Sequence, residues 1–155
     1  MKRPLVVSSS CVLLAIGVAA AQHSSTPRLA QATAASPAQP KGFKAMPVFK
    51  SGMNARNKPI EYPAGKAEVT AVIAEFEPGG TNGLHQHPVP AFVYVLEGTL
   101  TLQGEDGTTQ AYGPGQAFVE DVKFWHEAVN RGDRPVKIFA LFIGQEGTPV
   151  TIRAK

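Results

Sequence analysis

The amino-acid sequence predicts an all-β domain, either a small antiparallel barrel or a sandwich. Short segments rich in β-branched and aromatic residues recur at close spacing from Lys66 onward, and turn signals separate them. This region lacks the 3.6-residue apolar period of an amphipathic helix. The chain has 155 residues, the length of one domain, so we expect a single small β-domain.

The expected strands follow one another along the second half of the chain. Each is a β-branched or aromatic run that ends at a Gly-, Pro- or Asp-rich turn, and "GEDG" is the turn of a hairpin. The expected segments are 67–77, 90–103 (two runs around Gly98), 108–115, 116–122, 126–130 and 136–144. Small barrels of this kind often gain stability by association, so we expect a homodimer.

The first 21 residues predict a secretory signal peptide. Lys2 and Arg3 precede a short apolar run, and Ala19 and Ala21 form the small-residue pattern of a cleavage site. The run is too short for a membrane span, so we expect an exported protein, periplasmic or secreted, with no span after processing. The rest of the chain is then expected to comprise a flexible linker (22–44), an extension packing on the barrel (45–65), the barrel (66–146) and a tail (147–155).

Removal of the signal peptide changes the charge and the cysteine content. The remainder has 13 basic and 12 acidic residues and no cysteine, because Cys11 is the only one. A nearly neutral chain without a basic stripe argues against nucleic-acid binding. The mature chain also has no disulfide, thiolate ligand or cysteine nucleophile.

Three of the four histidines lie in two short patterns. His85 and His87 stand at i and i+2, so on a strand both side chains point to the same face. His126 follows in "FWHEAVN". Three imidazoles from neighbouring strands would bind a divalent transition metal and leave coordination positions open.

Two longer stretches resemble the conserved motifs of the cupin family. "PGGTNGLHQHPVPAFVYVLEG" is similar to the first motif, with Gly79, His85, His87 and Gly98 at the family spacing. "GPGQAFVEDVKFWHEAVN" is similar to the second, with Pro114, Gly115, His126 and Asn130 in place. The resemblance covers about residues 66–146 and implies a small antiparallel jelly-roll β-barrel. We interpret Asn130 as structural, with its amide fixing the following turn.

The resemblance implies one divalent transition metal held by His85, His87 and His126, with iron first and manganese, nickel, zinc or copper as alternatives. The family's glutamate is missing, because Ala91 occupies its position. Glu120, just before His126, can replace it as a fourth ligand, accept a hydrogen bond from a ligand imidazole or act as a general base. It can equally face solvent at the end of a strand.

The function that follows is an exported, metal-dependent enzyme that oxidises or dioxygenates a small chelating organic substrate. Isomerase or lyase chemistry can use the same residues. The alternative is a non-catalytic periplasmic protein that binds a metal or a small ligand. Phe118, Phe124 and Trp125 flank the second motif and are candidates for the wall of a substrate pocket.

Overall fold

The computed structural model describes residues 40–155. The predicted signal peptide and most of the predicted linker lie outside the described residues. In the described part, all regular elements are strands. They are β1 (Ala67–Phe76), β2 (His85–Gln86), β3 (Ala91–Glu97), β4 (Leu100–Gly104), β5 (Thr109–Tyr112), β6 (Ala117–Val119), β7 (His126–Asn130), β8 (Val136–Gln145) and β9 (Ile152–Arg153). Residues 40–155 contain no helix long and apolar enough to cross a membrane.

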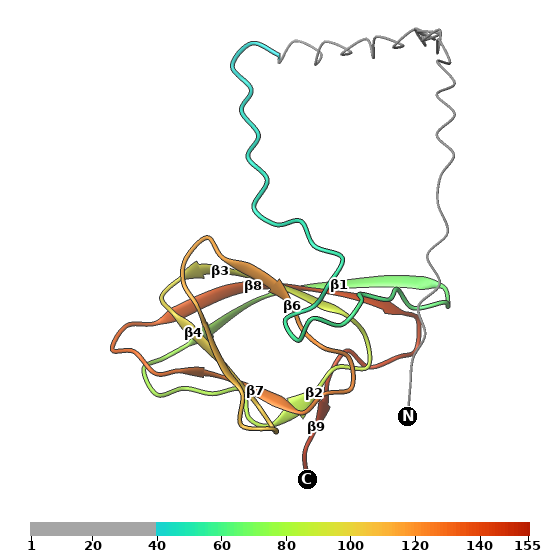
Figure 1. The fold of residues 1–155 in the computed structure, drawn as a ribbon, viewed down its shortest axis with the longest axis vertical. Coiled ribbons are helices and arrows are strands. Elements are labelled where there is room, and N and C mark those ends of the chain that lie inside the picture. The colour runs from blue at the N-terminus through green and yellow to red at the C-terminus, as the bar shows by residue number, and fades with distance from the viewer. Residues whose placement is uncertain (1–39) are drawn as a thin grey trace, which may run out of the picture. The chain divides into compact units, whose positions relative to one another are not determined.

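The strands form two sheets that face each other (Figure 1). One sheet has the order β1-β8-β3-β6, and the other has the order β5-β4-β7-β2-β9. All strand pairs within the sheets are antiparallel, and neighbours in space are mostly distant in sequence, as in a jelly roll. The predicted all-β antiparallel jelly-roll barrel is therefore confirmed.

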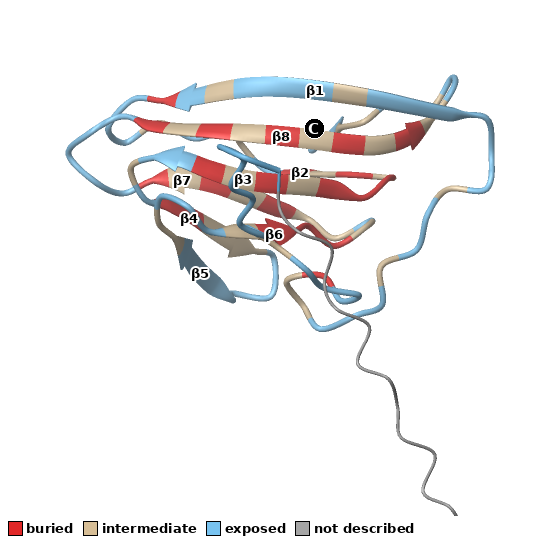
Figure 2. Ribbon diagram, turned by 90° about the horizontal axis from the view of Figure 1, so that it is seen from above, coloured by how far each residue is buried: buried red, intermediate tan, exposed pale blue. Residues whose placement is uncertain are grey.

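The hydrophobic core lies between the two sheets. β8 alternates buried and half-buried residues along its length, the pattern of a strand with one face on a core (Figure 2). The buried apolar side chains come from both sheets and include Val93, Val95, Leu100, Val136 and Phe142. The core therefore lies inside the barrel, and core residues such as Phe142 also contact the buried polar groups described below.

Residues 147–155 do not form the expected tail. β9 pairs with β2 and forms an edge of the five-stranded sheet, and the Ala154 amide donates to the Leu84 carbonyl. The β-branched Thr151 and Ile152 suit this pairing, but two residues are too short a run to recognise from sequence.

Asn130 fixes the end of β7. Its side chain is fully buried and donates to the carbonyls of Phe76 and Arg134, while its Oδ1 accepts from the Gly132 amide. The structural role predicted for Asn130 is confirmed, since its amide joins the turn after β7 to the end of β1.

Asn130→Ala is expected to lower the free energy of unfolding by about 3 kcal/mol, because it leaves buried backbone groups without partners. Chemical denaturation measures this loss. Gln110→Ala, which truncates an exposed amide in the same sheet, is the control and is expected to cost less than about 0.5 kcal/mol. Equal losses in the two variants would show that the buried hydrogen bonds do not carry the effect.

Candidate metal centre

Three histidines converge inside the barrel. His85 lies on β2 directly opposite His126 on β7, and His87 follows β2 in a bridge with Val122. All three are buried, with 2–3% of their surface exposed. Their ring centroids are 4.6–5.2 Å apart, and one nitrogen from each ring lies within 4.8 Å of the others. The strand spacing that the sequence suggested thus brings the three imidazoles together, although β2 itself ends at Gln86.

The backbone fixes the same tautomer in each ring. Nδ1 of His85 lies 2.7 Å from the Gly83 carbonyl, and Nδ1 of His87 lies 2.6 Å from the Val150 carbonyl. Nδ1 of His126 lies 2.8 Å from the Phe124 carbonyl. A carbonyl oxygen can only accept, so each Nδ1 carries the proton. In the neutral rings, each Nε2 therefore has a lone pair that faces the centre.

The three Nε2 atoms that face one another are all hydrogen-bond acceptors, and none of them carries a proton to donate. Nε2 of His85 and Nε2 of His87 are 3.1 Å apart, and Nε2 of His126 is buried without a hydrogen-bond partner. Lone pairs this close repel each other unless a proton or a cation lies between them. Three neutral imidazoles oriented by backbone carbonyls are typical ligands of a transition metal, so the residues fit such an ion.

The carboxylate of Glu120 lies next to the three imidazole rings. It follows β6 in the opposite sheet, and its amide donates to the carbonyl of Ala91. Its Oε2 lies 3.0 Å from Nε2 of His87, and its Oε1 lies 3.4 Å from Nε2 of His126. Only 7% of Glu120 is exposed, so the alternative that it faces solvent is wrong. The carboxylate thus reaches the histidines from beside Ala91.

The charges of these groups depend on one another. Burial raises the pKa of Glu120, but the adjacent imidazoles of His126 and His87 outweigh burial and lower the pKa to about 2. Burial lowers the pKa of His126, but the Glu120 carboxylate outweighs it and the net shift is upward. For His85, burial dominates and lowers the pKa. The lowered pKa keeps Glu120 ionised at neutral pH, which is the form in which a carboxylate binds a cation.

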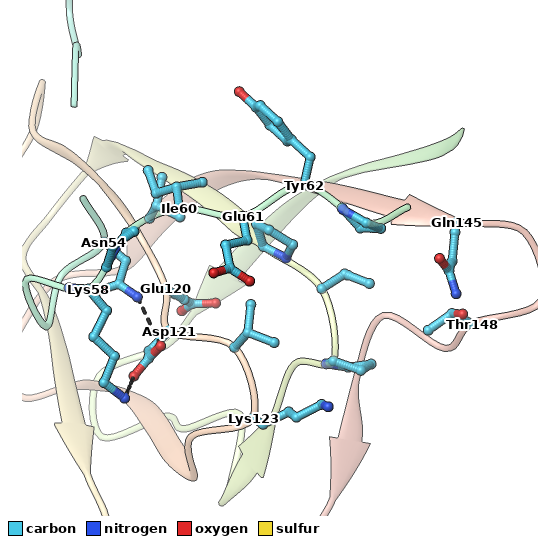
Figure 3. A pocket seen from close by; sticks show the side chains of 17 residues that line it. Asn54, Lys58, Ile60, Glu61, Tyr62, Glu120, Asp121, Lys123, Gln145 and Thr148 are labelled. Carbon is cyan, nitrogen blue, oxygen red and sulfur yellow. Dashed lines mark hydrogen bonds and ion pairs between the residues drawn. The ribbon is translucent and has the colours of Figure 1, made fainter. Parts of the chain in front are cut away.

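Several cavities meet at Glu120. A cavity of about 130 Å³ inside the barrel is lined by His85, His87 and Glu120, and one of about 300 Å³ by His126, Glu120 and Phe124. A larger one, of about 550 Å³, also reaches Glu120 (Figure 3). The buried carboxylate therefore lies on the walls of three cavities.

The three aromatic residues expected to line a pocket have different positions. Phe124 is on the wall of the 300 Å³ cavity. Phe118 lies in the hydrophobic core instead, stacked on Tyr112 with 3.9 Å between ring centroids. Trp125 is half-buried and lies outside the lining of this cavity. Phe118 turns inward because β6 alternates its side chains, which assigns Phe118 to the core between the sheets.

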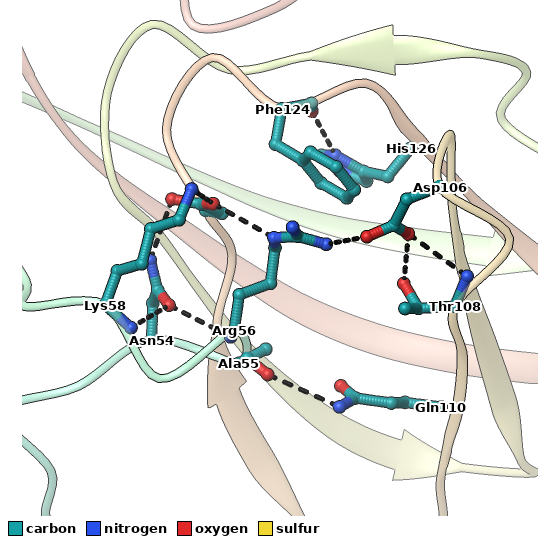
Figure 4. Close-up of polar contacts among 10 residues, drawn as sticks. Asn54, Ala55, Arg56, Lys58, Asp106, Thr108, Gln110, Phe124 and His126 are labelled. Atoms are coloured by element: carbon teal, nitrogen blue, oxygen red, sulfur yellow. Dashed lines mark hydrogen bonds and ion pairs between the residues drawn. The ribbon is translucent and has the colours of Figure 1, made fainter.

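Sequence reasoning missed a polar cluster beside the centre (Figure 4). Asp121 is buried and lies within ion-pair distance of Lys58, at 2.6 Å, and Arg56, at 3.3 Å. The Asn54 side chain donates to Asp121, and the Ala55 amide donates to the Val119 carbonyl. No local pattern in residues 54–58 indicates these contacts, because their partners lie more than 60 residues away in sequence.

Comparison with known proteins gives one family. Residues 72–143 match the family model described as Cupin domain, and this match supports the assignment of the chain to the cupin superfamily. This segment includes the three histidines and Glu120. No curated protein matches the chain significantly.

Several solved structures are similar to parts of this chain at low identity. The DMSP lyase DddQ from Ruegeria pomeroyi is 22% identical, with a TM-score of 0.49, over 56% of this chain and 43% of that one. A sugar phosphate isomerase from the cupin superfamily, from Silicibacter pomeroyi, is 27% identical, with a TM-score of 0.45, over 50% and 51%. A cupin domain from Bordetella pertussis is 21% identical, with a TM-score of 0.45, over 55% and 98%. The chain thus spans about half or less of the first two proteins.

Proposed function

We propose that this protein is an exported metal-binding cupin in which His85, His87, His126 and Glu120 hold one divalent transition ion. The observation that carries the proposal is the convergence of three buried Nε2 atoms whose Nδ1 atoms all donate to backbone carbonyls. Four neighbouring acceptors without a donor are costly to bury, and a cation satisfies them all. We propose iron as the ion, with manganese, nickel, zinc and copper as alternatives.

We further propose that the protein oxidises a small organic substrate with adjacent oxygen donors. Iron held by His85, His87, His126 and Glu120 would chelate the substrate and pass electrons from it to dioxygen. The chain supplies the rest. The backbone carbonyls orient the three rings, Glu120 contributes one negative charge, and the apolar wall formed by Phe142, Val93 and Leu100 limits water around His85 and His87.

The protein purified without chelators is expected to contain about one transition ion per chain, measured by mass spectrometry. Removal of the ion by a chelator is expected to lower the melting temperature by about 10 °C, since an ion present far above its dissociation constant stabilises the folded state by a few kcal/mol. Restoring the ion should restore the melting temperature. A protein that stays metal-free after reconstitution, or melts unchanged, contradicts the proposal.

Catalysis is tested on the loaded protein. Oxygen uptake with chelating hydroxy acids is the expected result for an oxidising enzyme. Stoichiometric metal and tight binding of such acids, without turnover by oxidation, isomerisation or elimination, would favour the non-catalytic alternative.

Export and dimer formation are also proposed. The basic and apolar segments of residues 1–21 support export. Exposed apolar side chains on the edge strand β1, with Val69 at 61% and Ile73 at 55%, support association through this strand. Cell fractionation and light scattering test the two proposals.

A further inference from the structure

The cavity of about 300 Å³ next to His126 has two chemically different ends. His126 and Glu120 belong to the proposed metal centre, and Arg56 lines the same cavity. Its volume is at the small end of the range for small-molecule sites. A compound that coordinates an ion at the first end therefore brings its remaining groups towards Arg56.

We propose that Arg56 binds the carboxylate of the substrate, and that the substrate is a small acid with a chelating oxygen pair at one end and a carboxylate a few bonds away. This inference rests on the proposed function, because the chelating end needs the metal centre.

The side chain of Asn54 holds the turn that carries Arg56 in place. The Asn54 Oδ1 accepts from the amides of Arg56, at 2.9 Å, and Lys58, at 3.0 Å. The Asn54 Nδ2 and the Lys58 ammonium both donate to Asp121, at 2.9 and 2.6 Å. A side chain on such an anchored turn keeps its direction, as a binding residue requires.

The guanidinium of Arg56 keeps donors available. Nη1 donates to Oδ2 of Asp106 at 2.6 Å, whereas Nε is buried without a hydrogen bond, although Oδ2 of Asp121 lies 3.3 Å away. A guanidinium has five N–H donors in a fixed plane, and a buried donor without an acceptor is costly. A carboxylate entering the cavity offers an acceptor to the guanidinium N–H groups that Asp106 and Asp121 do not engage.

Phe124 supports the guanidinium and sets its distance from the metal centre. The carbon at the centre of the guanidinium lies 3.7 Å from the centroid of the Phe124 ring. Figure 4 shows this ring between Arg56 and His126. A Cβ on Gly104 would lie 2.7 Å from the ring, so glycine there leaves room for it. The carboxylate bound by Arg56 is thus a distal group and not the group that faces the imidazoles.

The charges favour an anion. Arg56 and Lys58 offset Asp106 and Asp121, which pair with them. A divalent ion held by Glu120 and three neutral imidazoles leaves one net positive charge. An acid is therefore attracted to the loaded site, and a neutral compound of the same shape is not.

Calorimetric titration of the metal-loaded protein with malate and lactate tests the inference. Both acids carry the chelating 2-hydroxycarboxylate, and only malate adds a distal carboxylate. The wild type is expected to bind malate more tightly than lactate or the 4-amide of malate. Arg56→Gln is expected to weaken malate binding by about tenfold to a hundredfold and lactate binding by less than about twofold.

Two further variants distinguish direct binding of the carboxylate by Arg56 from a purely structural role of Arg56 in its loop. Lys58→Gln removes one of the contacts that hold the turn but leaves the guanidinium in the cavity, so it is expected to weaken malate binding by less than Arg56→Gln does. Asp106→Asn keeps the acceptor for Thr108 and frees the guanidinium, so it is expected to tighten malate binding by about two- to fivefold.

The inference is overturned if the wild type does not prefer malate, or if Arg56→Gln weakens malate and lactate equally. It is also overturned if Asp106→Asn weakens malate as much as Arg56→Gln does, because a purely structural ion pair predicts that result. Metal content is measured on every sample. A wild type without metal contradicts the proposed function and this inference together, whereas a loaded protein indifferent to Arg56 contradicts this inference alone.

Discussion

His87→Ala is expected to abolish stoichiometric metal binding. His87 sits between the other donors of the centre, with its Nε2 3.1 Å from Nε2 of His85 and 3.0 Å from Oε2 of Glu120. Its removal takes away one of the three imidazoles and leaves a weak binding set. The loss of affinity should exceed the factor of about 10 to 100 that follows loss of an outer partner. Mass spectrometry and titration with a competing chelator measure it.

Gln86→Ala is the matched control for this variant. Gln86 is half-buried, lies between the two histidines and points to the other face of the strand. It is expected to keep the metal content of the wild type. Circular dichroism of the metal-free proteins checks that His87→Ala still folds. A His87→Ala protein that holds metal as tightly as the Gln86→Ala protein would show that the three histidines are not the ligand set.

Glu120→Gln is expected to weaken metal binding by about 10- to 100-fold where the carboxylate is an outer partner of the ion, and by more where it is a direct ligand. The amide keeps the volume of the carboxylate and removes its charge, so packing changes little. The charge matters because a buried carboxylate is an efficient partner for a cation at a site that water barely reaches. Chelator competition on the Glu120→Gln protein gives the affinity directly.

Adding Ala91→Glu to the Glu120→Gln protein tests whether either position can supply the carboxylate. Ala91 is fully buried, and its carbonyl accepts from the Glu120 amide, so the two positions are adjacent on neighbouring strands. If either position can supply the carboxylate, the double variant regains metal affinity. Undiminished affinity in the single Glu120→Gln variant would contradict a role for Glu120 at the centre.

Local patterns predicted most of the fold. The β-branched and aromatic residues of 67–77 and 136–144 predicted the two long strands within a residue of their ends. The turn signals also predicted the segments around Gly98, whose φ of +71° and close contact with the Pro135 carbonyl exclude a side chain. β9 was missed, because two residues carry no periodicity and their partner strand β2 is distant in sequence.

For the metal centre, the three histidines were predictable but the orientation of their rings was not. The spacing of His85 and His87 and the second-motif position of His126 identified three converging side chains. The orientation of each ring was not predictable, since it depends on carbonyls such as that of Val150, 63 residues from His87. Arg56 was missed for the same reason, since its partners come from distant turns.

The sequence by itself determined the β-class of this protein, the order of its long strands and the histidines that meet in it. These follow from side-chain periodicity and spacing, which are local properties of the chain. Only the tertiary structure decided that Glu120 is buried against the imidazoles and that Arg56 shares a cavity with His126. Those results depend on which strands lie opposite one another, because burial and hydrogen bonding are set by neighbours in space and not in sequence.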